Sequence, residues 1–403
     1  MTKKRIALLT TWFPPNNGVA VNRMKAFAEY LSYDFEIEVF TIGNSTDEQV
    51  MENVIVHTQK TSQFWDKAKH NSKDSKFIHN IKSLINVVAS KFKISKLKAW
   101  EKSTLKNVES AHKNNPFDVV LSSYAPIEVH NIACSMKKKY SNLFWVADMR
   151  DEMSDNPFGS ETEKIFLQQK EKDFEKYIDA ITTVSEPILK SFKNIFSDVK
   201  VFEEVRNGFD HTVEPIKSFN EIFTFVYAGT FYGKNKPTFF LEVLNRLIVE
   251  GKIKQDFRIK FIGTSQNFSI PKILTEHCVF LPKVNYSSAI EEMRMADCNL
   301  LFSVPINSYG RFTGKLFDYL SVEKPILALV DLKDVGAELI NEHKSGFAVD
   351  FYDESEIEKA ILAVFELWKN KEFLPIDSSK TIQLHRKFQV EKLSKMIFKL
   401  LEE

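Results

Sequence analysis

Short apolar runs alternate along the chain with longer stretches in which apolar residues recur every three or four positions. Residues 5–10 (RIALLT) and 36–42 (EIEVFTI) are apolar runs typical of buried parallel strands. Between them, apolar residues mark one face of a helix at Val21, Met24, Ala28 and Leu31. The order strand, helix, strand predicts a βαβ unit at the start of the chain.

The same alternation continues through two successive halves of the sequence. In the first half, strands are predicted at 117–123, 143–148, 180–185 and 199–205, and a helix near 127–139. In the second half, strands are predicted at 223–229, 257–263, 279–282, 298–304 and 325–330, and helices at 237–249, 286–295 and 354–369. This pattern predicts an α/β fold with two Rossmann-like domains, each built on a mostly parallel sheet.

The expected domains are 1–207 and 222–380, joined by a polar linker near 208–222 that contains a proline. The last predicted helix, 383–402, is expected to pack back on the first domain. A length of 403 residues fits two domains better than one.

Composition narrows the class of protein. Hydrophobic residues make up 43% and charged residues 27%, and the net charge of +1 gives no global field for nucleic acid. Cys134, Cys278 and Cys298 form no close pair, and no HxxxH or CxxC spacing occurs, so neither a disulfide framework nor a metal site is expected. No apolar stretch approaches the roughly 20 residues of a membrane-spanning helix. These features predict a cytoplasmic protein without a metal, a cofactor or a nucleic-acid partner.

Residues 60–106 interrupt the alternation, because they hold twelve lysines against three acidic residues. Apolar residues are interspersed among the lysines, as in a basic amphipathic helix that lies on an anionic membrane surface. The alternative is a solvated helix whose apolar face belongs to the core.

Ligands of open α/β sheets bind beyond the carboxyl ends of the strands, so the residues that follow each predicted strand are site candidates. Glycines, hydroxyls, lysines and acids gather there: Gly18, Asp148, Arg150, Asp151, Gly229, Thr230, Lys234, Lys236, Thr313, Gly314, Lys315 and Asp318. In two domains that face each other they would line one cleft, and this mixture suits a diphosphate with neighbouring hydroxyl groups.

The stretch 311–327 (RFTGKLFDYLSVEKPIL) carries the most specific local signal. A Gly-Lys pair at the start of a helix suits an anion, because free N–H groups and the helix dipole favour negative charge there. Asp318 follows Lys315 by three residues and would accept hydrogen bonds from a ribose. A capped core helix is the alternative. The motifs GxGxxG and GxxxxGK[ST] are absent, which disfavours a dinucleotide oxidoreductase and a P-loop ATPase.

Several motifs, taken in order, resemble the retaining family 4 (group 1) glycosyltransferases of GT-B fold. The opening TWFPPNNGVAVNRMKAFAEYL resembles PP-x-x-G-G-x-x-R-x-x-x-L-A-x-x-L, and VRNGFD resembles the N-G-F/V-D signature before the linker. WVADMRDE, FVYAGTFYGKNKP and LPKVNYSSAIEEMRMADCNLLF are similar to further family segments. GKLFDYLSVEKPIL resembles K-x-x-E-Y-L-A-x-G-K-P. The resemblance spans nearly the whole chain.

The resemblance implies a role for each candidate residue. Thr313, Gly314 and Lys315 would hold the phosphates of a nucleotide-sugar donor of UDP or GDP type, and Asp318 would hold its ribose. The other donor-binding candidates are Gly18, Gly229, Thr230, Lys234, Lys236 and Val284. Asp148, Arg150 and Asp151 are the catalytic candidates, with a structural ion-pair set as the alternative, and no metal is implied.

The chain departs from the family pattern at three places. The family's acidic pair is spaced E-x7-E, whereas here the second acid is Asp318 and Gly310 stands in the place of the first. Thr230 stands near the place of the usual arginine, and Val19 replaces the second glycine of the first loop. Recognition of the donor sugar is therefore the part of the resemblance that these residues support least.

The function expected is transfer of a sugar from a nucleotide-sugar donor to an acceptor hydroxyl. A lipid-linked saccharide of bacterial surface polysaccharide synthesis is the expected acceptor, reached at the inner face of the membrane through 60–106. A nucleotide-sugar epimerase and a non-catalytic nucleotide-sugar-binding protein are the alternatives.

Overall fold

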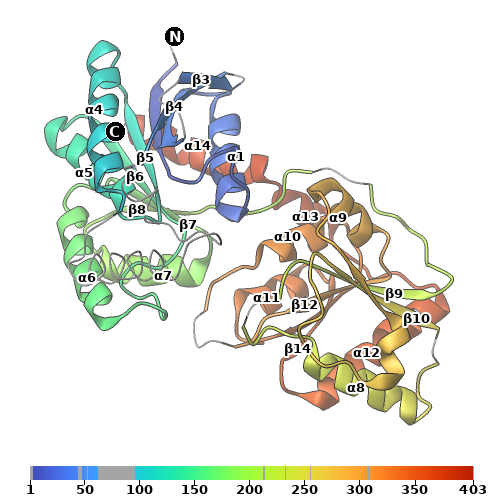
Figure 1. Cartoon of the computed structure of the whole chain (residues 1–403). Coiled ribbons are helices and arrows are strands. Elements are labelled where there is room, and N and C mark those ends of the chain that lie inside the picture. Colours follow the sequence, from blue (N-terminus) through green and yellow to red (C-terminus); the bar gives the residue numbers. More distant parts are fainter. Residues whose placement is uncertain are drawn as a thin grey trace, which may run out of the picture. The chain divides into compact units, whose positions relative to one another are not determined.

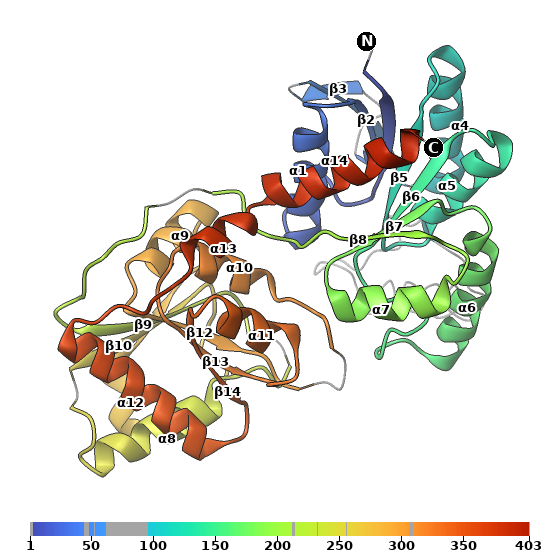
Figure 2. The ribbon, with the colours of Figure 1, turned by 180° about the vertical axis from the view of Figure 1, so that it is seen from behind.

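The computed structural model describes residues 3–43, 48–51, 53–61, 96–211, 214–231, 233–254, 256–305 and 309–402. The chain forms two compact units (Figures 1 and 2). Unit 1 comprises Met1–Val205 and Val390–Glu403, and unit 2 comprises Arg206–Gln389. Most of the basic segment 60–106, for which a helix is expected, lies outside the described residues.

Unit 1 is built on an eight-stranded sheet in the order β3-β4-β2-β1-β5-β6-β7-β8. All neighbouring strands are parallel except β3 and β4. The strands are β1 (Arg5–Leu9), β2 (Glu36–Ile42), β3 (Glu48–Met51), β4 (Val54–Gln59), β5 (Val119–Tyr124), β6 (Phe144–Met149), β7 (Ala180–Thr183) and β8 (Val201–Glu204). Strands β1 and β5 are buried throughout, because helices cover both faces of the sheet.

Two separate apolar cores flank this sheet. On one face lie α1 (Val19–Leu31) and α14 (Arg386–Glu402). On the other face lie α4 (Lys98–Asn114), α5 (Glu128–Lys139), α6 (Glu161–Glu175) and α7 (Glu186–Ile195). Helix α14 begins in unit 2, and from Val390 onward it belongs to unit 1, where Leu393 and Ile397 are fully buried.

Unit 2 is built on a six-stranded parallel sheet in the order β11-β10-β9-β12-β13-β14. The strands are β9 (Phe223–Ala228), β10 (Phe257–Ile262), β11 (Cys278–Leu281), β12 (Cys298–Phe302), β13 (Ile326–Val330) and β14 (Gly346–Asp350). The chain moves outward from β9 to β11 and then returns to β12 on the other side of β9. The prediction of two Rossmann-like α/β halves is therefore confirmed.

Helices cover both faces of the second sheet as well. One core holds α8 (Thr238–Val249) and α12 (Glu354–Asn370), and the other holds α9 (Tyr286–Arg294), α10 (Gly314–Ser321) and α11 (Val335–Glu342). The 3-10 helix η1 (Lys272–His277) precedes β11, and α13 (Ser378–Gln383) contacts α10. Helix α10 buries Leu316, Phe317, Tyr319 and Leu320 against the sheet, which fixes its first turn at the sheet's carboxyl edge.

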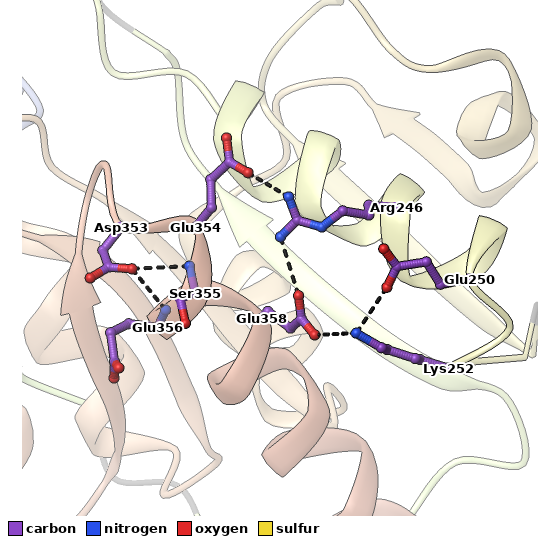
Figure 3. Close-up of polar contacts among 8 residues, drawn as sticks. All are labelled: Arg246, Glu250, Lys252, Asp353, Glu354, Ser355, Glu356 and Glu358. Carbon is purple, nitrogen blue, oxygen red and sulfur yellow. Dashed lines mark hydrogen bonds and ion pairs between the residues drawn. The ribbon is translucent and has the colours of Figure 1, made fainter.

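Ion pairs on the surface join α8 to α12 (Figure 3). Arg246 pairs with Glu354 and Glu358, and Lys252 lies 2.7 Å from Glu358 and 2.8 Å from Glu250. These side chains are exposed enough for water and salt to screen their charges, so the pairs add little to stability.

Candidate functional site

The start of α10 meets the loop that follows β9. The Lys315 ammonium donates a 2.6 Å hydrogen bond to the Tyr227 hydroxyl, and its carbon chain runs beside Gly229. A Cβ added to Gly229 would lie 2.3 Å from Lys315 Cε, and Gly229 has φ of +125°. Only glycine suits this position, because both the backbone angle and the neighbouring lysine exclude a side chain.

Lys315 is a half-buried cation at the first turn of α10. Among the described residues it forms no salt bridge, and burial lowers the pKa of its ammonium to about 8. A buried charge is costly unless an opposite charge accompanies it. An anion at the first turn of α10 would supply that charge, as the Gly-Lys pair predicts.

Asp318 lies one turn further along α10 and is engaged by a tyrosine. The Tyr286 hydroxyl donates to Asp318 Oδ1 at 2.6 Å, and His211 Nδ1 lies 3.2 Å from the same hydroxyl. His211 Nε2 lies 2.5 Å from the Ser321 hydroxyl, which in turn donates to the Asp318 carbonyl. Burial raises the pKa of the Asp318 carboxyl to about 6, and the hydrogen bond from Tyr286 limits that rise.

The loop after β9 holds the other predicted donor-binding residues of unit 2. Thr230 is exposed and donates to the Gly263 carbonyl at 3.3 Å, and Lys234 is exposed. Lys236 donates to the Asn267 carbonyl at 2.8 Å, so it supports the loop in this structure. Val284 packs its apolar side chain against the core beneath α9 and α10. Only its backbone groups could therefore form hydrogen bonds with a ligand.

The N-terminus of α10 adjoins a small cavity. Thr313 is the N-cap of the helix, but its side chain makes no capping bond, and its buried Oγ1 finds no hydrogen-bond partner among the described residues. The cavity has a volume of about 120 Å³ and lies where β12 and β13 end. Polar residues form much of its lining: Ser303, Arg311, Thr313, Asp331 and Asp334.

In unit 1, Asp148 proves to be a structural residue, which corrects its assignment as catalytic. Its side chain is wholly buried and pairs with Arg23 at 2.6 Å. The hydroxyls of Ser123 and Thr182 donate to it at 2.7 and 2.8 Å. Burial alone would raise the pKa of Asp148, but Arg23 and the two hydroxyls outweigh burial and lower it. A carboxylate with no exposed atom cannot touch a substrate.

Arg150 and Asp151 lie nearer the surface at the carboxyl end of β6. Their side chains pair at 3.2 Å, and 46% of the Asp151 side chain is exposed. The Arg150 guanidinium lies 5.7 Å from the ring centre of Trp12, whose indole donates to the Ala125 carbonyl. Gly18 is the N-cap of α1, and a Cβ added to it would have no atom within 4 Å. Apart from its place after β1, no sequence feature marks Trp12 as a site residue.

His130 of α5 is buried, and its Nδ1 lies 2.8 Å from the Ser122 hydroxyl. Burial lowers its pKa to about 3, so it stays neutral.

A larger cavity of about 450 Å³ opens at the amino ends of β9 and β10, beside Ile222 and Arg258. No predicted site residue lines it. The described residues contain no group of His, Cys, Asp and Glu that could hold a metal ion.

Replacing Asp318 with asparagine tests whether this carboxylate holds a ribose. The variant should fold normally, because asparagine keeps the acceptor for Tyr286 and removes a charge that burial disfavours. We expect donor affinity to fall several-fold, since charge-assisted hydrogen bonds are about twice as strong as neutral ones. Calorimetry should also show that Asp318→Asn discriminates less between the natural donor and its 2′,3′-dideoxyribose analogue.

The same role predicts a pH dependence. The wild-type preference for the natural donor should weaken as pH falls below about 6, where Asp318 takes up a proton. The variant's preference should not change over this range. A loss of unfolding temperature with intact donor affinity would instead make Asp318 a helix-stabilising residue only.

Comparisons with known proteins bear on the family and the fold of the chain. Residues 222–366 match the family model described as Glycosyl transferases group 1. Over 99% of the chain, the structure superposes on all of a sucrose-phosphate synthase from Thermosynechococcus elongatus, with a TM-score of 0.63 and 10% identity. No curated protein sequence matches the chain.

Two further solved structures share the fold over nearly their whole lengths. The α,α-trehalose 6-phosphate synthase of Burkholderia multivorans has a TM-score of 0.60 and 9% identity, with 100% of this chain and 99% of that chain covered. HepE of Anabaena, solved in complex with UDP and glucose, has a TM-score of 0.56 and 13% identity, with 99% and 98% covered. At such low identity these likenesses show the fold.

Within the described part of the chain, no helix has the length and apolar character needed to cross a membrane. The comparisons confirm the GT-B fold that the resemblance in the sequence implied, and residues 222–366 match the group 1 glycosyl transferase model.

Proposed function

We propose that this protein transfers a sugar from a nucleotide-sugar donor to an acceptor hydroxyl. The observation that carries the proposal is the half-buried Lys315 ammonium, which has no salt-bridge partner among the described residues and lies at the first turn of α10, within the residues that match the group 1 model. Asp318, one turn away, suits the ribose of the same donor. The described units would then bind the donor in unit 2 and the acceptor in unit 1.

In this proposal, catalysis rests on stabilising the leaving group. Negative charge develops on the nucleoside diphosphate as the sugar departs, and fixed donors placed where that charge appears lower the barrier. Lys315 and the free N–H groups of α10 would be those donors, without a metal. Retention of configuration at the sugar is part of the proposal, and it rests on the resemblance. Arg150 and Asp151 are our candidates for contacts near the acceptor.

The proposal is tested with a panel of UDP- and GDP-sugars, assayed by release of the nucleoside diphosphate in the presence of saccharides or membrane lipids. A labelled sugar on an acceptor supports the transferase. Interconversion of the donor sugar would indicate an epimerase. Binding without either reaction would indicate a binding protein, a possibility that Gly310 at the place of the family's first carboxylate keeps open.

For the acceptor we propose a lipid-linked saccharide of bacterial surface polysaccharide synthesis, because the lysines of 60–106 would favour an anionic membrane surface. The protein should sediment with anionic vesicles and dissociate at high salt, since salt screens exposed charges. A variant with Lys91, Lys93, Lys96 and Lys98 changed to glutamine should remain in the supernatant.

A matched control changes exposed lysines elsewhere to glutamine: Lys139, Lys190, Lys359 and Lys369. This control carries the same net charge as the first variant and should sediment like the wild type. Equal sedimentation of all three proteins would rule out membrane contact through 60–106.

A further inference from the structure

The cavity of about 120 Å³ beside α10 combines charged and hydroxyl side chains from three segments. Ser303 follows β12, Arg311 and Thr313 precede α10, and Asp331 and Asp334 follow β13. The cavity therefore adjoins the helix turn that carries Lys315. Any group attached to a diphosphate at that turn would have this cavity as a neighbour.

Backbone amides fix both carboxylates of the cavity. Asp334 Oδ1 accepts hydrogen bonds of 2.8 Å from the amides of Gly310 and Val335, and Asp331 Oδ1 accepts one of 2.9 Å from Lys333. Asp334 is also the N-cap of α11. Carboxylates held in this way need no rearrangement to bind a ligand, which lowers the entropic cost of binding.

The bond between Asp334 and Gly310 places a carboxylate against one particular backbone position. In the resemblance, position 310 is where group 1 glycosyltransferases carry the first acid of their E-x7-E pair. Gly310 has no side chain, yet the carboxylate of Asp334 lies within hydrogen-bond distance of its amide. A residue 24 positions later in the sequence thus brings a negative charge to the place where the motif lacks one.

We propose that this cavity receives the sugar of the donor, that Asp334 takes over the role of the missing carboxylate, and that the sugar is an uncharged one. The inference rests on the proposed function. Asp331 and Asp334 can accept hydrogen bonds from sugar hydroxyls, Arg311 can donate, and the buried Thr313 hydroxyl finds no partner among the described residues. Two carboxylates beside one guanidinium disfavour a sugar that itself carries a carboxylate, because like charges repel.

The test measures binding of UDP, UDP-glucose and UDP-glucuronate by calorimetry, or of the GDP counterparts if the donor panel selects that base. Wild type should bind the neutral donor at least about tenfold more tightly than the acidic one. Asp334→Asn keeps an oxygen for both backbone amides and removes only the charge. This variant should bind UDP as wild type does, bind UDP-glucose about tenfold more weakly, and lose most of the preference against the acidic donor.

Asp353→Asn is the matched control, because Asp353 is the N-cap of α12 and accepts from the amides of Ser355 and Glu356 at 3.0 Å (Figure 3). It should leave all three affinities and their ratios unchanged. Tighter binding of UDP-glucuronate by wild type, or an unchanged preference in Asp334→Asn, would overturn the inference. Failure to bind any nucleoside diphosphate would instead refute the proposed function.

Discussion

Replacing Asp148 with alanine should destabilise unit 1 by about 3–5 kcal/mol, because the change leaves the Arg23 guanidinium charged and without its carboxylate in the interior. The Arg23 side chain is 1% exposed and that of Asp148 is 0% exposed, so the pair lies in the interior of the unit. The hydroxyls of Ser123 and Thr182 lose their acceptor at the same time. Denaturant unfolding, followed by fluorescence or circular dichroism, measures this loss.

Arg23 also connects Asp148 to the segment by which the chain leaves unit 1 after β8. Its guanidinium donates a 2.6 Å hydrogen bond to the carbonyl of Val205, the last residue of unit 1 before the chain enters unit 2. The pair therefore joins α1, β6 and the segment after β8. Enzymatic activity should disappear from Asp148→Ala in parallel with its folded fraction, as expected for a structural residue.

A control and a pH series separate this effect from general sensitivity of the unit. Lys4→Ala breaks the surface pair with Asp118 and should cost under about 1 kcal/mol, because that lysine is mostly exposed. The pKa of Asp148 is lower in the folded protein than in the unfolded chain. The ion pair with Arg23 therefore stabilises unit 1 fully above the usual pKa of an aspartate. This stabilisation is lost as the pH falls through the lower pKa of the folded state. A stable Asp148→Ala protein that folds normally but lacks activity would restore the catalytic assignment.

Asp148 also shows where sequence reasoning reached its limit. The rule that ligands bind beyond the carboxyl ends of strands placed it correctly near the end of β6. The rule does not say which way a side chain points, and the partner that engages Asp148 comes from 125 positions earlier in the sequence. A buried ion pair between distant segments has no local signature.

Most of the fold could be predicted from the sequence, because many of its strands are continuous apolar runs. The predicted runs at 5–10, 36–42 and 223–229 correspond to β1, β2 and β9 within a residue or two at each end. The pattern missed α6 and α7, whose outward faces are rich in charge, and the short strand β14, which is only partly buried. Weak hydrophobic contrast explains the omission of α6 and β14, whereas α7 was missed although its apolar and polar residues lie on clearly separate faces.

The proposed donor site could be predicted from the sequence only where its residues lie close together in the chain. Lys315 and Asp318 lie in one turn of helix, so their spacing alone placed them together. Tyr286 and Asp334 come from other elements, and only the folded sheet brings them to α10. No pattern of residue types in a single segment could have indicated these two.

Replacing Lys315 with methionine should weaken binding of the nucleoside diphosphate by about tenfold or more, because a hydrogen bond to a charged group is worth roughly 1.5–3 kcal/mol. Methionine keeps an unbranched side chain beside Gly229, and the Tyr227 hydroxyl can still donate to the Thr230 carbonyl. Lys254→Met is the control, since Lys254 is exposed and precedes the amino end of β10, whereas Lys315 lies at the carboxyl edge of the sheet. Calorimetry with UDP and GDP gives the affinities.

The lowered pKa of Lys315 turns this prediction into one with a defined pH range. Below about 8 the ammonium is charged and attracts the diphosphate, so wild-type affinity should be highest there and should fall as pH rises through that value. Binding above about 8 should take up a proton, which calorimetry in two buffers of different ionisation enthalpy detects.

Stability should change in the opposite direction. The unfolded chain holds the Lys315 proton more tightly than the folded one, so burial of the charge costs stability below a pH of about 8, and this cost is relieved as pH rises toward 10.5. Lys315→Met should therefore unfold at the same or a higher temperature at neutral pH while it loses affinity for the diphosphate. A residue kept for packing alone would show the reverse pattern, with reduced stability and unchanged affinity. Nucleoside diphosphate affinity within about twofold of wild type would remove Lys315, and with it the main support for the donor site.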